Sequence, residues 1–401
     1  MNCVGIDVSK GKSMIAVMRP FGEIVLPPFE IGHTVNELSV LADKLKALDG
    51  ETRVVMESTG NYHAPVALLL SEAGIYVSVV NAMLVHDYGN NSLRRAKTDK
   101  KDAVKLANYG LDRWNSLPRY TPEDDPRLLL KNCYRQYQRY SKVQTLLKNN
   151  LISLLDTIFP GVNRLFTSPA RADGSEKWVD FVAEFWHCQC VSKLSIRVFS
   201  NRYLKWCRKH GYNFTLPKME EIYTLASNTV GVLPVSRTTE LLVKQAVAQL
   251  EATSSAVAAL RQEMNALAET LPEYPVVMEM FGVGSSLGPQ LMAEIGDVRR
   301  FHSKKALVAF AGIDAPPYQS GQMEVRSRSI SKRGSSSLRR TLFLVMSAIL
   351  RNSPADEPVY QFMDRKRAEG KPYRVYMMAS ANKFLRIYYA TVKQYLDSLE
   401  A

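Results

Sequence analysis

The segment MNCVGIDVSKGKSMIAVM (residues 1–18) carries the pattern that decides the fold of the first part of the chain. Two short apolar runs, 4–6 and 13–17, flank a glycine-containing turn, and a third run, 23–26, follows another glycine. Runs of this length between such turns are typical of strands in a β-meander. We therefore predict three sequential strands, the first of which ends at Asp7.

The chain then alternates between helical and extended patterns. The segments TRVVME (52–57) and IYVSVV (75–80) predict two buried strands with a helix between them. Three strands followed by alternating helix and strand indicate an α/β layer. Glu57 ends the strand 52–57. If that strand neighbours the first one, Asp7 and Glu57 project from the same edge of the sheet.

The segment KTDKKDA (97–103) sets Asp99 and Asp102 one helical turn apart among three lysines. Residues at i and i+3 share a helix face, so the two carboxylates would lie together. Like charges this close repel, and a shared cation relieves the repulsion. The alternative is an ordinary helix start, with Thr98 or Asp99 as N-cap and an acidic first turn. If this helix caps the sheet edge, four carboxylates converge.

The overall charge favours a polyanionic partner. The formal net charge of the 401 residues is +13 and the sequence pI is about 9.4, which favours nucleic acid over a membrane surface. Charge that serves only solubility is the alternative. Asp7 precedes any long apolar run, so we expect neither a signal peptide nor a membrane span at the N-terminus. Five scattered cysteines indicate no disulfide framework, and a reducing cytoplasm is expected.

Two heptad-like seams follow the proline-bearing segment LPRYTPEDDP (117–126). Apolar residues that recur at alternating spacings of three and four predict two long helices. Such helices form either an antiparallel pair or a dimeric coiled coil, and ordinary bundle packing is the alternative. The first seam comprises Leu130, Cys133, Tyr137, Tyr140, Gln144, Leu147, Leu151, Leu154 and Ile158; the second comprises Val243, Ala246, Leu250, Thr253, Val257, Leu260, Met264, Leu267 and Leu271.

The segment 161–234 between the seams is rich in aromatic residues and predicts a small helical insertion. It contains Cys-x-Cys and Cys-x-x-His motifs, which are possible zinc ligands, although the first spacing is tighter than usual. Buried cysteine beside tryptophan in a core is the alternative. The residues concerned are His187, Cys188, Cys190, Cys207 and His210.

The last part of the chain carries two phosphate-binding candidates. The segment MFGVGSSLGPQLMAEIG (280–296) is similar to a helix-hairpin-helix turn, whose backbone N–H groups suit a phosphate. The segment PYQSGQMEVRSRSISKRGSSSLRR (317–340) holds the densest group of cations, opposed only by Glu324. These cations are Arg326, Arg328, Lys332, Arg333, Arg339 and Arg340.

Taken together, the motifs resemble the DEDD transposases of bacterial insertion sequences. That group includes the Piv-type DNA invertases and the bridge-RNA-guided recombinases. The resemblance covers roughly residues 1–120 and 275–390. It rests on GIDVSK (5–10), MESTGNY (56–62), KTDKKDA (97–103), GVGSSLGPQLMAEIG (282–296), FAGIDAPPYQSG (310–321) and ISKRGSSSLRR (330–340).

The resemblance implies an α/β plus α-helical architecture in three parts. These are a RuvC-like domain of the ribonuclease H fold (1–120), a coiled-coil linker with a helical insertion (121–272) and a mainly helical serine transposase domain (273–401). It also implies an acidic tetrad that binds Mg²⁺, with Mn²⁺ as a possible substitute, and a serine nucleophile. The tetrad is Asp7, Glu57, Asp99 and Asp102, and the nucleophile is Ser320.

The chemistry of these residues is consistent with that assignment. Clustered carboxylates can hold two Mg²⁺ ions about 3.5–4 Å apart, which stabilise the entering and leaving oxygens of a phosphoryl transfer. A serine hydroxyl needs activation, and no histidine lies near Ser320 in the sequence. The resemblance implies a composite site, with acids from one subunit and the serine from another. Tyr318 is the rival nucleophile.

The resemblance further implies a cytoplasmic, nucleoid-associated homo-oligomer, dimer or tetramer, with no membrane partner. Its partners would be donor and target double-stranded DNA and a guide RNA, with Lys97, Lys100 and Lys101 contacting nucleic acid beside the six cations above. A junction nuclease that acts only by hydrolysis is the first alternative, and a covalent protein–DNA adduct would exclude it. An actin-like ATP-binding protein and a non-catalytic RNA-binding scaffold are alternatives from other classes.

Overall fold

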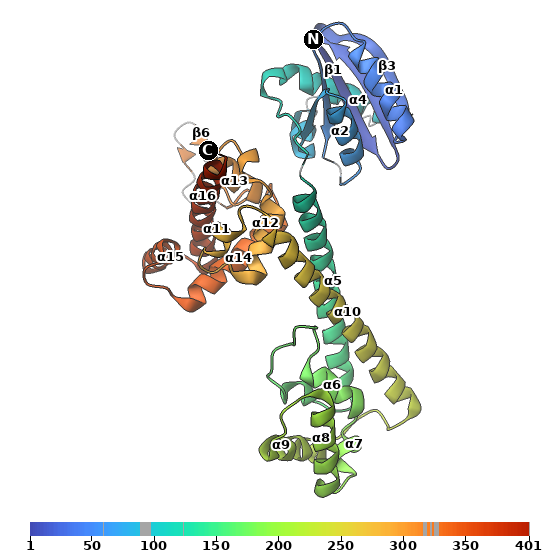
Figure 1. Ribbon diagram of the computed structural model, residues 1–401, viewed down its shortest axis with the longest axis vertical. Coiled ribbons are helices and arrows are strands. Elements are labelled where there is room, and N and C mark those ends of the chain that lie inside the picture. Colours follow the sequence, from blue (N-terminus) through green and yellow to red (C-terminus); the bar gives the residue numbers. More distant parts are fainter. Residues whose placement is uncertain are drawn as a thin grey trace. The chain divides into compact units, whose positions relative to one another are not determined.

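The computed structural model describes residues 1–58, 60–88, 98–122, 124–315, 319–320, 323–324 and 329–400. For residues 87, 319–320 and 323–324 it describes the backbone alone. Contacts divide the chain into two compact units, Met1–Pro122 and Glu123–Ala401 (Figure 1). Each unit contains two clusters of buried apolar side chains.

The first unit is built on a five-stranded sheet with the strand order β3-β2-β1-β4-β5. The predicted meander is confirmed: β1 (Asn2–Ser9), β2 (Lys12–Arg19) and β3 (Glu23–Gly32) are antiparallel neighbours. β4 (Thr52–Glu57) pairs in parallel with β1, and β5 (Tyr76–Val80) pairs in parallel with β4. The α/β layer expected from the sequence is therefore present.

Helices cover both faces of this sheet. α1 (Val35–Lys46) and α2 (His63–Glu72) pack on the face that carries Ile6. α3 (Ala82–Tyr88) and α4 (Asp99–Asp112) pack on the face that carries Cys3. Because side chains alternate between the faces of a strand, the odd-numbered positions of β1 face α4.

Two glycines allow α4 to lie directly on the sheet. A Cβ atom on Gly5 would lie 2.0 Å from the carbonyl oxygen of Ala103, and one on Gly110 would lie 2.3 Å from Sγ of Cys3. The end of α4 therefore covers the start of β1, and its middle covers Gly5. Accordingly α4 runs antiparallel to β1, with its first turn toward the C-terminal end of that strand.

The second unit contains an antiparallel pair of long helices, α5 (Asp125–Leu155) and α10 (Arg237–Glu269) (Figure 1). Cys133 Sγ lies 3.5 Å from the carbonyl oxygen of Leu260, and Gln144 Nε2 lies 2.9 Å from Ser254 Oγ. Of the arrangements expected from the sequence, the antiparallel pair within one chain is observed. Tyr140 is nevertheless exposed, because an α-helix drifts away from a strict heptad repeat.

The two ends of this helix pair belong to different cores. At one end, α6 (Lys177–Glu184), α7 (Gln189–Ser192), α8 (Ile196–His210) and α9 (Leu216–Asn228) form the expected helical insertion. At the other end lies a bundle of α11 (Tyr274–Met278), α12 (Gly284–Ile295), α13 (Lys304–Ala311), α14 (Ser336–Asn352), α15 (Pro358–Ala368) and α16 (Tyr373–Leu399). No helix in the described part of the chain is long and apolar enough to cross a membrane.

His187 and the cysteines of the insertion lie in or against its core, and His210 is half-buried beside Trp206. The ring of buried His187 lies 3.1 Å from the carbonyl oxygen of Leu233 through Nε2, and its Nδ1 accepts the N–H of Gln189 at 3.0 Å. Burial raises the pKa of the Cys190 and Cys207 thiols, which disfavours the thiolate that zinc requires. Among the described residues no group of three or more His, Cys, Asp or Glu side chains is placed to hold a metal ion.

Candidate active site

The register of two parallel strands places Asp7 beside Glu57. Ile6 of β1 pairs with Met56 of β4, so the residues that follow them, Asp7 and Glu57, lie at the same level of the sheet. Glu57 ends β4 as predicted, whereas β1 does not end at Asp7 but continues to Ser9, because these residues still pair with β2. Paired residues on parallel neighbours point to the same face. Because Gly5 lies under α4, Asp7 is also on the α4 face. Both carboxylates are half-buried.

The first turn of α4 supplies the other two acids. Thr98 is the N-cap, since its Oγ1 accepts the N–H of Lys101 at 3.3 Å, and Asp99 and Asp102 follow in the first turn. The helix start expected from the sequence is therefore formed. Carboxylates are favourable at this position because the helix N-terminus carries partial positive charge. Asp102 is half-buried and Asp99 is exposed.

Electrostatics indicate where Asp99 lies. Lys12 Nζ donates a hydrogen bond to the Glu30 carboxylate at 2.8 Å. This hydrogen bond and the negative charges of Glu30 and Asp99 raise the pKa of Lys12. Lys12 begins β2, directly after the turn from β1. The Asp99 charge therefore acts on Lys12, which directly follows the turn between β1 and β2.

The donor chemistry of the four acids suits a hard divalent cation. Carboxylate oxygens are the ligands that Mg²⁺ and Mn²⁺ prefer. Among the described residues, which include all four acids, no three ligating side chains lie close enough to enclose one ion. The acids therefore suit a divalent metal by donor type.

Ser320 lies in a short hairpin of the second unit. β6 (Gln319–Ser320) pairs antiparallel with β7 (Met323–Glu324), and Ser320 lies opposite Met323. Its side chain lies outside the described part of the chain, as do Lys97, Tyr318, Arg326 and Arg328.

The base of the segment that carries Ser320 is fixed by hydrogen bonds. The N–H of Ser331 donates to the carbonyl oxygen of Asp314 at 2.8 Å, and the Ser331 hydroxyl donates to the Asp314 carboxylate. The N–H of Lys332 donates to the carbonyl oxygen of Gly312 at 3.0 Å. Sequence reasoning missed Asp314, whose only signal was its position six residues before Ser320.

The predicted basic residues divide by environment. Arg339 donates from Nη1 to the carbonyl oxygens of Ala311 at 2.9 Å and Gly334 at 3.2 Å, so it also fixes the backbone. The exposed members are Lys100, Lys101, Lys332, Arg333 and Arg340.

Further cations were missed by sequence reasoning. Arg374, Lys383 and Arg386 of α16 line a cavity of about 1310 Å³ together with Lys332, Arg339 and Arg340. In the sequence these three residues are spread along one long helix. Only the packing of α14, α15 and α16 brings them close to Lys332, Arg339 and Arg340.

Two family models match the chain. Residues 4–160 match a DEDD transposase model of the IS110 type, and residues 274–361 match the model of the transposase IS116/IS110/IS902 family. Together the matches span more than half of the chain and include all four acids and Ser320.

The chain belongs to the DEDD transposases of bacterial insertion sequences. It is accordingly an enzyme that transposes or recombines DNA, as the resemblance implied.

Several relatives of this transposase are known. It is 23% identical over 390 residues to an IS110 insertion-element protein of Streptomyces coelicolor, a match that covers 97% of this chain and 93% of that protein. It is 22% identical over 343 residues to the pilin gene-inverting protein of Moraxella bovis, covering 85% and 80% of the two chains. Over 129 residues it is 32% identical to the transposase of IS1111A from Coxiella burnetii, covering 32% and 34%.

One solved structure with similarity is T. thermophilus RuvC in complex with a Holliday junction substrate. The match has 14% sequence identity and a TM-score of 0.23, and it covers 29% of this chain and 95% of that chain.

Proposed function

We propose that this transposase cuts and rejoins DNA through a covalent phosphoserine at Ser320. In this proposal the acids of the first unit hold the divalent metal, Mg²⁺ or Mn²⁺, and a guide RNA partly encoded by the same element selects the DNA sites. The enzyme acts in the cytoplasm as a homo-oligomer. The metal ligands are Asp7, Glu57, Asp99 and Asp102.

The observation that carries the proposal is the shared edge of the four acids. Asp7 and Glu57 directly follow the paired residues Ile6 and Met56, and α4, which packs on Gly5, begins toward that end of β1 with Asp99 and Asp102 in its first turn. The strand order β3-β2-β1-β4-β5, with β4 and β5 parallel to β1, also supports a domain of the ribonuclease H type.

The covalent step is a phosphoryl transfer. Ser320 Oγ forms a bond to phosphorus while the bond between phosphorus and one deoxyribose oxygen breaks, and the serine proton passes to an acceptor as the departing oxygen is protonated. The reverse reaction with a new strand end releases the serine and rejoins DNA without an energy source. A bound divalent ion supplies stabilisation of the charge that develops on the entering and departing oxygens.

The residues of the chain have separate tasks in this step. The carboxylates of the first unit hold the cation, and Asp102 projects from a helix N-terminus that already favours negative charge. The exposed cations Lys332 and Arg333 follow the segment that carries Ser320 and hold phosphate groups near it. Ser320 and the acids belong to different units, which is consistent with a site composed from two subunits.

Metal dependence tests the acidic part of the proposal. The wild-type enzyme is incubated with supercoiled DNA that carries the ends of its element, together with the adjacent noncoding transcript, and strand cleavage is followed as Mg²⁺ is titrated. We expect Glu57→Gln and Asp102→Asn to lose cleavage at every Mg²⁺ concentration, whereas Asp112→Asn at the other end of α4 keeps it. Wild-type cleavage that persists in EDTA would contradict the proposal.

A further inference from the structure

The cavity of about 1310 Å³ in the second unit lies among α14, α15, α16 and residues 329–332. Its volume exceeds the range of about 300–1,000 Å³ that is typical of small-molecule sites. We refer to it as the basic groove, defined by lining residues from α14 (Ser336, Arg339, Arg340, Phe343), α15 (Phe362) and α16 (Arg374, Val375, Met378, Asn382, Lys383, Arg386, Ile387), with Ala315, Ser329, Ile330 and Lys332 at one side.

The charged residues that line the basic groove are all cations. Six Lys and Arg side chains line it and no Asp or Glu does. Within the described part of the chain, none of the six forms an ion pair. Lys383 donates to the carbonyl oxygen of Pro358 at 2.6 Å, and Arg339 is held by backbone carbonyls, so both are positioned without being neutralised. Uncompensated cations in one concave site favour an anionic polymer.

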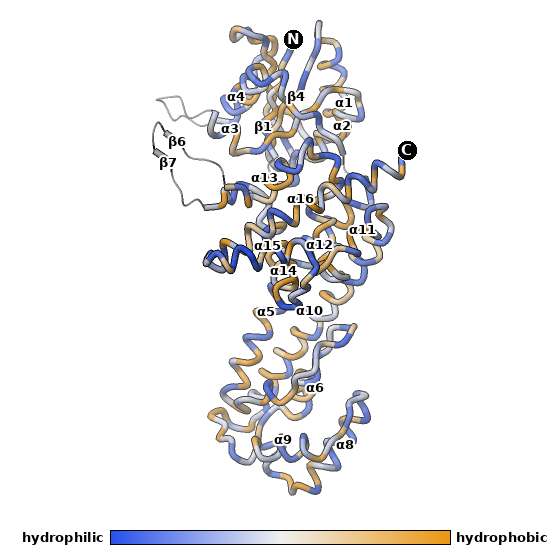
Figure 2. The backbone as a smooth tube through the Cα atoms, turned by 90° about the vertical axis from the view of Figure 1, so that its left-hand side faces the viewer, coloured by the Kyte–Doolittle hydropathy of each residue, from blue (hydrophilic) through white to orange (hydrophobic). Residues whose placement is uncertain are grey.

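The basic groove also has an aromatic and aliphatic floor. Phe362 is half-buried, and Lys383 Nζ lies 5.2 Å from the centre of its ring. Two more cations of α15, Arg365 and Lys366, lie 5.3 Å and 5.7 Å from the same ring, in the hydrophilic run at the end of that helix (Figure 2). Phe343 is fixed by an edge-to-face contact with Tyr373 at 6.1 Å between ring centres.

The combination of cations and aromatic rings favours an unpaired strand over a duplex. A duplex presents phosphates and base edges, but its base faces are stacked inside. A groove that combines cations with two aromatic rings suits an unpaired strand, whose phosphates meet the cations and whose bases stack on a ring.

Covalent geometry ties the basic groove to Ser320. Ala315 and Ser329 line the groove, and they lie on either side of the segment that carries the serine. Ser320 is five residues beyond Ala315, and five extended residues span at most about 18 Å. Backbone hydrogen bonds from Ser331 N–H to the Asp314 carbonyl and from Lys332 N–H to the Gly312 carbonyl hold the two sides of this segment together.

We propose that the basic groove binds an unpaired DNA strand next to the site of cleavage, with its bases stacked on Phe362. Only the placement beside the cleavage site rests on the proposed function of Ser320. The binding itself rests on the charges and rings of the groove. DNA is the expected strand because the enzyme recombines DNA, and strand exchange requires bases to leave their partners.

Fluorescence anisotropy with labelled oligonucleotides tests the proposal. The probes are a single-stranded DNA, the duplex of the same sequence and the matching single-stranded RNA. We expect Phe362→Ala to weaken single-stranded DNA binding about 5- to 150-fold, the range for loss of one base–aromatic stack, and to leave duplex binding unchanged. Phe362→Leu, which keeps apolar volume without a ring face, should show a similar loss.

The charge is tested in parallel. Arg386→Ala should weaken single-stranded DNA binding and reduce the slope of log affinity against log salt by about 0.7. Arg351→Ala on α14 and Phe21→Ala are matched controls for charge and for an exposed ring, because neither residue lines the groove, and both should bind like the wild type. Unchanged melting temperatures show that the variants are folded.

Three results would overturn the proposal. These are an unchanged affinity for single-stranded DNA in the Phe362 and Arg386 variants, an equal loss for the duplex, and a loss confined to RNA. Ser320→Ala separates this proposal from the proposed function: it should bind the single strand like the wild type. If the groove variants fail to weaken binding while Ser320→Ala still abolishes the covalent adduct, only the groove assignment is wrong.

Discussion

At the scale of single residues, small side chains decide whether the acids can meet. Gly5 is the clearest case, because α4 crosses β1 with its backbone against the position where a Cβ atom would stand. The position of α4, whose first turn carries Asp102, therefore depends on a residue that has no chemistry of its own. The motif GIDVSK carries one acid and the glycine that allows the helix with the other acids to approach.

Gly5→Ala is expected to displace α4. The added Cβ would lie 2.0 Å from Ala103 O and 2.4 Å from the backbone N of Ala107, contacts that side-chain rotation cannot relieve. We expect a loss of at least about 1–3 kcal/mol in the free energy of unfolding, measured by urea denaturation, together with loss of cleavage.

Gly11→Ala is the matched control. Gly11 has open space around it but a left-handed φ of 78°, so its substitution should cost only about 1–2 kcal/mol of backbone strain and should preserve cleavage. A fully active Gly5→Ala enzyme would show that the position of α4 does not matter for the site.

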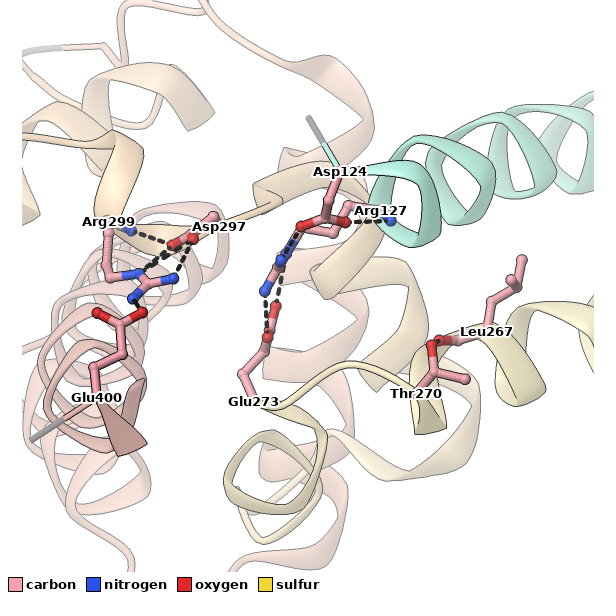
Figure 3. Close-up of polar contacts among 8 residues, drawn as sticks. All are labelled: Asp124, Arg127, Leu267, Thr270, Glu273, Asp297, Arg299 and Glu400. Carbon is pink, nitrogen blue, oxygen red and sulfur yellow. Dashed lines mark hydrogen bonds and ion pairs between the residues drawn. The ribbon is translucent and has the colours of Figure 1, made fainter. Parts of the chain in front are cut away.

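A pH-dependent contribution to stability comes from Asp297. Burial acts to raise the pKa of this carboxyl, but hydrogen bonds from Arg299, including one of 2.8 Å from Nη2, outweigh it and lower the pKa (Figure 3). A lowered folded pKa stabilises the protein above the ordinary value, and this contribution is lost as the pH falls below about 4. Asp297→Asn should therefore flatten the fall in the free energy of unfolding between pH 5 and 3. An unchanged slope would contradict this assignment.

At the scale of elements, one buried ion pair joins the start of α5 to the start of α11. Arg127 contacts Glu273 at 3.2 Å through Nε and at 2.5 Å through Nη2, and it also pairs with Asp124 (Figure 3). Glu273 is 1% exposed and Arg127 is 7% exposed, so neither charge is hydrated. The pair holds the long helix against the bundle that contains the basic groove.

Arg127→Ala should cost roughly 3–5 kcal/mol in the free energy of unfolding, because it leaves the buried Glu273 charge without a partner. Lys366→Ala, which breaks the more exposed pair with Glu369, should cost no more than about 1 kcal/mol. Both values follow from urea denaturation of the full chain. The double variant Arg127→Met with Glu273→Leu should recover much of the loss, and failure to do so would show that packing, and not the charge, carries the effect.

Elements with a strong local pattern were predictable from the sequence. The strand 52–57 was predicted with the bounds that β4 has, and Thr98 as the cap of α4 follows from its hydroxyl. The antiparallel pairing of α5 with α10 could not be chosen over a dimer, because an apolar seam does not specify its partner. The basic groove could not be foreseen, because α14, α15 and α16 bring its cations together only in three dimensions.

At the scale of the whole molecule, the proposed chemistry is divided between two units. The acids belong to Met1–Pro122, and Ser320 belongs to Glu123–Ala401. A homo-oligomer can bring acids of one subunit to the serine of another, which would make cleavage depend on assembly. If the composite site forms, two variants that are inactivated in different units should therefore complement each other.

Mixing two inactive variants tests the composite site. Ser320→Ala and Asp102→Asn proteins, each without activity alone, should recover part of the wild-type activity when combined, since one site can draw both intact residues from different chains. Recombination of the DNA substrate measures the recovery. A mixture that stays inactive although mixed oligomers form would place the acids and the serine of each site in one chain.

The most direct test of the central claim is the chemical identity of a trapped protein–DNA adduct. Wild-type enzyme, incubated with Mg²⁺ and labelled DNA that carries the element ends, is denatured and digested, and the peptide that retains a nucleotide is identified by mass spectrometry. We predict a phosphodiester on Ser320 that is absent in both Ser320→Ala and Asp102→Asn, although both variants still bind DNA. An adduct that persists in Ser320→Ala and disappears in Tyr318→Phe would contradict the account and assign the nucleophile to the tyrosine.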